Sequence, residues 1–231
     1  MANASTAFGF RQTGQLPGGP ATFEMRVRSI QATNATPISQ GDPVVRAGPA
    51  SPYISNATTG SVTATTALQG IFVGCRFIPK TGGGAVESNS WPGSASSSDA
   101  VAFVIDNPEA QFLVSSIGSA ITSASVGLNV NYAINSLSAG ISTNNFSAAQ
   151  ISSAFLPTGI SSFVVDGASV STSSTLPFKI VGLYGPSFGN TSNNAPGNFG
   201  AVGNGSDPTT LFNWVIVSFN QQAFTAGQTG G

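Results

Sequence analysis

The amino-acid sequence predicts an all-β protein: a compact β-barrel or β-sandwich core with long loops, an extended N-terminal arm and at most one or two short helices. Three observations favour this fold class. Val, Ile, Phe, Thr and Ser recur along the 231 residues, whereas the residues that usually cover helix surfaces are scarce. The 28 Gly and 14 Pro indicate many turns. Short apolar or alternating runs are separated by clusters of turn-forming residues.

Residues 1–20 are predicted to form the arm, because Gly9, Gly14 and the run PGGP at 17–20 interrupt any long helix or strand. Phe8 and Phe10 lie in this polar, glycine-rich setting. They either anchor the arm on the core of the chain itself or insert into a partner, and the sequence leaves both alternatives open.

Residues 21–231 are predicted to be a single all-β domain, with a candidate inserted segment at 135–158. Its first strand, residues 23–30, alternates apolar and charged residues, which predicts a half-buried strand whose outer face carries Glu24, Arg26 and Arg28. The other predicted strands lie at 41–45, 61–70, 71–78, 100–105, 111–115, 128–134, 163–165, 178–184 and 211–219. The last of these is apolar on both faces, so we expect it to be covered on both sides.

One short helix is predicted at 147–156, where Ser147 is a suitable cap, Ile151 and Phe155 are spaced i, i+4, and Pro157 would end the helix. The segments 79–98 and 186–208 are rich in Gly, Ser and Asn. Loops of this length in a compact domain are usually functional or disordered.

Charge is sparse and unevenly distributed. Only 6% of the residues are charged, against about 25% in average soluble domains. The net charge of −1 divides into +4 before residue 81 and −5 after it. In an assembly, the basic part of one copy could contact the acidic part of its neighbour. The simpler interpretation is that the charges are scattered and solvated. No basic cluster is dense enough to neutralise several phosphates, so we expect no nucleic-acid partner.

We also expect no membrane partner, since no apolar stretch approaches the roughly 20 residues that span a bilayer. The N-terminal residues lack the early positive charge and apolar run of a secretory signal, which predicts synthesis in a cytoplasm.

Groups suited to catalysis or metal binding are few. The chain has no His, the commonest general base, and therefore no Ser-His-Asp triad. Cys75 is the single cysteine and lies in an apolar run, which predicts a buried small hydrophobic residue. Asp106 and Glu109 form the nearest carboxylate pair, but Asp106 is better explained as a turn aspartate that bonds its own backbone amides. The loop 204–207 is a weak calcium candidate. The sequence thus predicts no enzyme, no cofactor and no metal site.

Several short motifs occur in an order that resembles a family of tailed-bacteriophage head decoration (cement) proteins. They are AFGFR at 7–11, GDPVVRAG at 41–48, GIFVGCRF at 70–77, WPG at 91–93, VIDNP at 104–108 with Phe112, GLN at 127–129, GISSFVVD at 159–166 with Ser169, LPFKIVGL at 176–183 and VIVSFN at 215–220. The chain departs from that family in two places: Gln221 and Gln222 follow Asn220 where the family often ends Asn-x-His, and residues 135–158 look like additional material.

The resemblance implies a structural virion protein that binds the outer surface of an icosahedral head and bridges neighbouring capsid subunits. Its partners would be the major capsid protein and other copies of itself, commonly in a homotrimer. It would be made in the host cytoplasm and end on the virion surface. The candidate contact residues for the capsid or for other subunits are Phe8, Phe10, Arg11, Arg26 and Arg28.

Two other functions are alternatives to this one. The first is a carbohydrate-binding or adhesive module of a tail fibre, in which Trp91, Tyr184 and Trp214 would stack on sugars. The second is a hydrolase that uses Asp106 or Asp166, which the scarcity of acids and bases disfavours.

Overall fold

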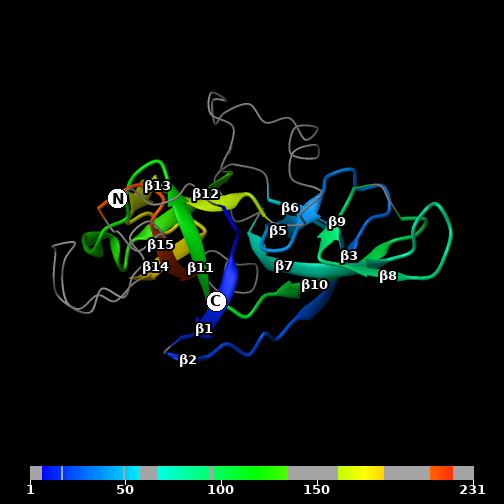
Figure 1. Cartoon of the computed structure of the whole chain (residues 1–231), viewed down its shortest axis with the longest axis horizontal. Helices are drawn as coiled ribbons and strands as arrows, with labels where there is room; N and C mark the ends of the chain where they lie inside the picture. The colour runs from blue at the N-terminus through cyan, green and yellow to red at the C-terminus, as the bar shows by residue number, and fades with distance from the viewer. Residues whose placement is uncertain are drawn as a thin grey trace.

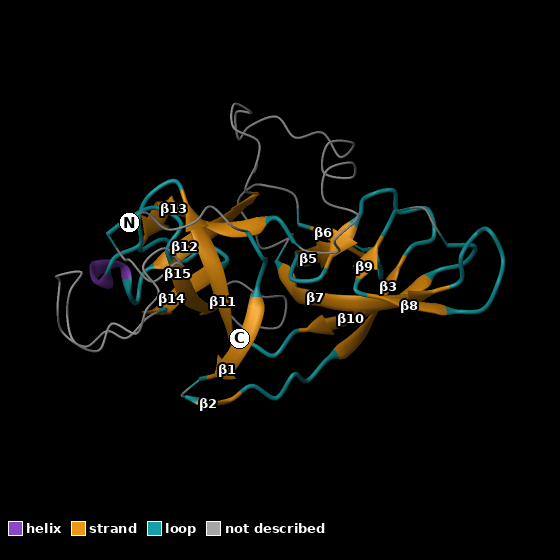
Figure 2. Cartoon of the chain, viewed as in Figure 1, coloured by secondary structure: helices purple, strands orange, loops and turns teal. Residues whose placement is uncertain are grey.

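The computed structural model describes residues 7–16, 18–48, 50–57, 67–93, 96–134, 161–184 and 209–220. Within these residues the chain forms fifteen strands and one 3₁₀ turn, Ser123–Ser125, so the all-β prediction is confirmed. The predicted helix at 147–156, the candidate insertion at 135–158 and the loop at 204–207 lie outside the described residues. Figure 2 shows the strands gathered into two groups, one at each end of the molecule.

One group is a closed barrel (Figure 1). Its strands are β11 (Ala110–Ile117), β12 (Asn129–Ile134), β13 (Phe163–Ser171), β14 (Phe178–Leu183) and β15 (Trp214–Phe219). They pair in the order β13-β12-β14-β15-β11, and a parallel pairing of β11 with β13 closes the ring. Closure leaves these strands without open edges. The sequence left open whether the core is a barrel or a sandwich, and in this half of the molecule it is a barrel.

The N-terminal segment lies along this barrel. Strand β1 (Arg11–Gln15) pairs antiparallel with β11, and β2 (Gly19–Pro20) pairs with β1. Phe10 is 2% exposed, and its ring stacks on Phe178 with 4.5 Å between the ring centroids. In the described residues this segment is thus part of the barrel sheet, and Phe10 anchors it on the core of the chain itself.

The second group is a six-stranded sheet. Five of its strands follow one another in the order β3-β10-β7-β5-β6, and the sixth, β8, pairs with β7. Two further strands form a small separate sheet. The strands of the larger sheet are β3 (Arg26–Ile30), β5 (Pro43–Arg46), β6 (Ile54–Asn56), β7 (Leu68–Phe77), β8 (Val86–Ser88) and β10 (Ala100–Ile105), and those of the small sheet are β4 (Ile38–Ser39) and β9 (Ser90–Trp91). The two runs predicted at 61–70 and 71–78 thus contribute one strand, β7, rather than two, and residues 61–66 lie outside the described part.

Close backbone contacts join the two groups. The amide of Phe10 donates to the carbonyl of Gly41 (3.0 Å), and the amide of Gly41 donates to the carbonyl of Phe72 (2.8 Å). Gly9 has φ +71°, and a Cβ there would lie 2.4 Å from the Cβ of Ser161. Only glycine fits such a position, because it tolerates both the left-handed backbone and the close approach.

Asp42 is buried in this junction and is 4% exposed. Its Oδ2 accepts a hydrogen bond from the backbone amide of Ser39 (2.8 Å), and the side chain of Ser161 bonds to it as well. Burial raises the pKa of Asp42 to about 7, although both hydrogen bonds act to lower it. The junction therefore contains a carboxyl group that is partly protonated near neutral pH.

Apolar side chains fill both groups and the space between them. The larger cluster combines barrel residues with Leu68 and Ile71 of β7, and the smaller one surrounds Trp91 and Phe72 within the second sheet. Cys75 belongs to the smaller cluster and is 1% exposed, which confirms its predicted burial. Burial raises the pKa of the Cys75 thiol to about 12.

Candidate interaction surface

Strand β3 and the residues before it turn their apolar side chains outwards. Phe23, Met25 and Val27 are 58%, 48% and 62% exposed. The sequence predicted that these residues are buried and that Glu24, Arg26 and Arg28 lie outside. The predicted burial is wrong, whereas Glu24 and Arg26 are exposed as predicted and Arg28 is half-buried. The strand is also shorter than the predicted 23–30, because β3 begins at Arg26.

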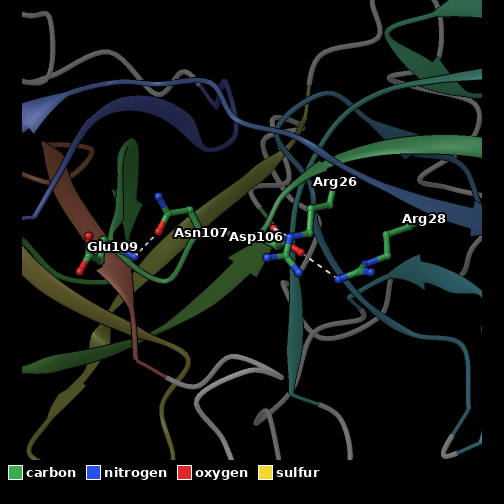
Figure 3. A network of polar contacts seen from close by, with 5 residues as sticks. All are labelled: Arg26, Arg28, Asp106, Asn107 and Glu109. Atoms are coloured by element: carbon green, nitrogen blue, oxygen red, sulfur yellow. Dashed lines mark hydrogen bonds and ion pairs between the residues drawn. The ribbon is translucent and has the colours of Figure 1, made fainter.

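Asp106 explains the reversal (Figure 3). Its side chain is only 6% exposed and forms an ion pair with Arg28 (Nη2 to Oδ2, 2.8 Å) and a longer one with Arg26 (Nε to Oδ1, 3.4 Å). In the sheet Arg26 pairs with Val104 and Arg28 with Ala102, so both arginines share a face with buried residues. A buried carboxylate is costly without a charged partner. Arg28 therefore turns inwards, Arg26 reaches the same carboxylate from the exposed edge, and the apolar side chains between them turn to the surface.

Burial raises the pKa of Asp106, and the two arginines oppose that rise. The carboxylate of Asp106 also accepts a hydrogen bond from its own backbone amide, as the sequence predicted, and this bond acts to lower its pKa. In the turn that follows, Oδ1 of Asn107 accepts a hydrogen bond from the amide of Glu109 (2.9 Å) (Figure 3). The basic first part of the chain and its acidic remainder therefore meet here within one molecule.

The exposed apolar side chains continue onto β10. Val27 pairs directly with Phe103, and Val101, two residues away on the same face, is 37% exposed. We call Phe23, Met25, Val27, Val101 and Phe103 the apolar stripe. Phe23 has φ +50°, an unusual backbone conformation for a bulky residue and a sign of local strain. Strain of this kind is concentrated at functional positions.

A second exposed group lies on the barrel. The ring of Tyr184, a residue that is 43% exposed, lies 5.2 Å from the ring of Trp214. Phe8 contacts the same indole edge-on at 5.0 Å. The Nε1 of Trp214 is buried and has no hydrogen-bond partner in the described part of the chain. We call Phe8, Trp214 and Tyr184 the aromatic platform.

The predicted contact residues fall in four different settings. Phe10 is in the core and is not available to a partner, and Phe8 is part of the aromatic platform. Arg11 is half-buried, its Nε donates to the carbonyl of Phe8 (3.0 Å), and burial lowers its pKa. Arg26 and Arg28 hold Asp106.

Sequence reasoning missed the residues of the apolar stripe as contact candidates. Phe23, Met25 and Val27 had been assigned to the buried face of their strand. No local signal in the sequence would have corrected this, because the acid that reverses the strand lies about 80 residues further along the chain.

In the described ranges no group of three or more His, Cys, Asp or Glu side chains is placed to hold a metal ion. Of the helical segments in those ranges, none is long and apolar enough to cross a membrane. Comparisons with protein-family models, with curated proteins and with solved structures give no match.

Proposed function

We propose that this chain is a structural virion protein that binds the outer surface of an icosahedral phage capsid and stabilises it by bridging neighbouring capsid subunits. The observation that carries this proposal is the exposure of apolar side chains at two separate places on one β framework. The apolar stripe lies on β3 and β10, and the aromatic platform lies on the barrel, at the other end of the molecule in Figure 1.

A protein that bridges two subunits needs at least two attachment surfaces. Apolar surfaces suit this role, because burying them is favourable and does not require the desolvation of ions. Many copies on a symmetric shell then share the load, each through an interface of modest size. The ordered motifs that resemble the head decoration proteins add independent support.

The same proposal includes the major capsid protein as the partner, a homotrimer as the assembly, the outer surface of the head as the location and a role without catalysis. These four points follow from the resemblance. The paired state of Asp106, which was one of the two acids considered for a hydrolase, fits a structural role.

Co-sedimentation with undecorated heads tests the proposal. The stripe variant Val27→Ser and the platform variant Tyr184→Ser should each bind heads at least tenfold more weakly than the native chain. Val126→Ser is the matched control, because Val126 is 42% exposed but belongs to neither surface. Failure of the native chain to bind heads at micromolar concentration would reject the proposal.

The alternative is a carbohydrate-binding module, and one observation favours it: Tyr184 presents an exposed ring backed by Trp214. Trp91 takes no part in this alternative, since it is 0% exposed and its Nε1 donates to the carbonyl of Asn34 (3.1 Å). Binding on a glycan array that disappears in Tyr184→Ala would support the carbohydrate function over the capsid function.

A further inference from the structure

Five strands of the second group follow the same ring order as the five strands of the barrel. In chain order they are β3, β5, β6, β7 and β10, which we call the N-terminal ring, and β11, β12, β13, β14 and β15 in the barrel. In both, the first strand pairs with the fifth, the fifth with the fourth, the fourth with the second and the second with the third, always antiparallel. The third strand then meets the first in parallel, by the bridge of Ser29 to Tyr53 in the N-terminal ring and by the pairing of β11 with β13 in the barrel.

A register shift interrupts both structures at the same place. In the N-terminal ring the pairing of β10 with β7 skips Val73, which lies in the sequence Phe-Val-Gly. In the barrel the pairing of β15 with β14 skips Val181, which lies in the sequence Ile-Val-Gly. Irregularities of this kind are retained within families of folds. The shared shift therefore indicates more than a shared strand order.

A glycine with positive φ precedes the second strand of both structures. Gly41 has φ +94° and Gly127 has φ +90°. The amide of each glycine donates to a carbonyl of the fourth strand, that of Phe72 or of Ile180, at 2.8 Å in both cases. The amide of that same residue donates back to the carbonyl of the residue after the glycine, at 2.8 Å and 2.9 Å. Phe72 and Ile180 directly precede the two skipped valines, so the turn and the register shift form one repeated unit.

We infer that the N-terminal ring and the barrel are two copies of one five-stranded barrel, and that the apolar stripe and the aromatic platform are the same face of it. By register Val101 of the stripe is equivalent to Trp214 of the platform, since each lies opposite a serine of the first strand, Ser29 or Ser115. Other equivalent pairs on this face are Val27 and Leu113, Phe103 and Ile216, and Arg76 and Tyr184.

Equivalent positions contact one another even where their chemistry differs. Arg26 and Asp106 of the N-terminal ring correspond to Phe112 and Phe219 of the barrel. The first two form an ion pair at 3.4 Å, and the rings of the other two meet edge-on at 5.2 Å. Apolar residues of similar volume can replace a buried ion pair without loss of stability. The contact is thus kept in both copies while its residues differ, which explains why the repeat is faint in the sequence.

A chain that carries one face twice is suited to bind two copies of one partner surface. A shell of identical subunits presents the same surface on each neighbouring subunit. On a capsid, which is the part of the inference that rests on the proposed function, the stripe and the platform take the same apolar patch on two adjacent subunits. Linkage of the two faces in one chain strengthens attachment beyond that of either alone.

Disulfide trapping tests the closure of the N-terminal ring without any partner. Neighbouring strands lie about 4.7–4.9 Å apart, within the range that a disulfide spans. Ser29→Cys combined with Tyr53→Cys should therefore form an intrachain disulfide under mild oxidation at least about tenfold faster than the displaced pair Val27→Cys with Tyr53→Cys. The pair Ile117→Cys with Asp166→Cys, at the parallel pairing that closes the barrel, is the reference. Equal rates for the first two pairs would leave the ring open and overturn the duplication.

Photo-crosslinking on undecorated heads tests the shared partner surface. A benzoylphenylalanine side chain is placed at Arg76 or at Tyr184, two equivalent positions that are both exposed. Both variants should capture the same peptide of the same capsid subunit. The matched control carries the photo-reactive group at Val126, which is exposed but belongs to neither face, and should capture no capsid peptide.

Capture of two different peptides by variants that bind heads would reject the shared surface and leave the proposed function intact. A native chain that does not bind heads would reject the shared surface together with the proposed function. The duplication is decided by the disulfide experiment alone, so it can fail or hold separately from both.

Discussion

Replacement of Asp42 by Asn should remove a large part of the pH dependence of stability. The carboxyl group is 4% exposed, and its pKa is raised from 3.8 to about 7. The folded chain therefore holds this proton up to about pH 7, whereas the unfolded chain releases it near pH 4. Since the folded state binds more protons in this window, the free energy of unfolding falls as the pH rises from about 4 to about 7.

The size of the effect follows from the shift of about three pKa units. At 1.36 kcal/mol per unit, ionisation of Asp42 lowers the stability of the native chain by about 4 kcal/mol at pH 8 relative to pH 4. Asn has the shape of the neutral acid and keeps an oxygen that accepts the hydrogen bond from Ser39. We expect Asp42→Asn to match the native chain at pH 4 and to be more stable by up to about 4 kcal/mol at pH 8.

Urea unfolding followed by tryptophan fluorescence at pH 4, 5, 6, 7 and 8 measures both curves. Asp99→Asn is the control, because the hydrogen bond from Tyr53 lowers the pKa of Asp99 below its usual value of 3.8, so its contribution is lost only below the measured range. Its difference from the native chain should therefore change little between pH 5 and 8. A difference between Asp42→Asn and the native chain that stays constant within about 1 kcal/mol across this range would refute the reasoning.

Three further substitutions test other parts of the structure by the same unfolding measurement. Asp106→Ala leaves the charge of Arg28 without its main partner and should lower the free energy of unfolding by about 3–5 kcal/mol. An effect below about 1 kcal/mol would contradict the explanation given for the orientation of β3. Phe10→Ala should cost about 3–5 kcal/mol and Phe8→Ala clearly less, because only Phe10 is in the core. Gly9→Ala should destabilise the fold by at least about 1 kcal/mol, because Gly9 has positive φ and lies close to Ser161. Gly84→Ala is the control, since a Cβ at Gly84 meets no atom within 4 Å, and equal effects of the two substitutions would argue against a tight junction.

The sequence predicted several strands well because their signals are local. The strand at 100–105 agrees with β10, and that at 178–184 with β14 to within a residue. The pairings that shape the fold are distant in sequence. Strand β1 pairs with β11, where Arg11 lies opposite Leu113, and the parallel pair of β11 and β13 joins strands separated by residues 118–162. Short apolar runs do not encode such partners.

The sequence predicted only part of the candidate surface, and the reason is physical. Alternation along β3 gave two faces, but the choice between them depends on Asp106, a buried charge on another strand. Arg26 and Arg28 were predicted as contact residues for the capsid or another subunit, and the contact that the structure shows for them is the ion pair with Asp106 of the same chain. The exposed Met25 and Val27 could be found only once that contact was known.

The position of β15 in the barrel has a consequence for how the chain is made. Strand β15 comes last of the described strands, yet it lies between β14 and β11 in the ring. The barrel cannot close on the ribosome until residue 219 has emerged, whereas the strands of the second sheet are complete by residue 105. The sheet that carries the apolar stripe can therefore fold first during synthesis. Phe10 is synthesised early, but the barrel site that buries it forms only after most of the chain has been made.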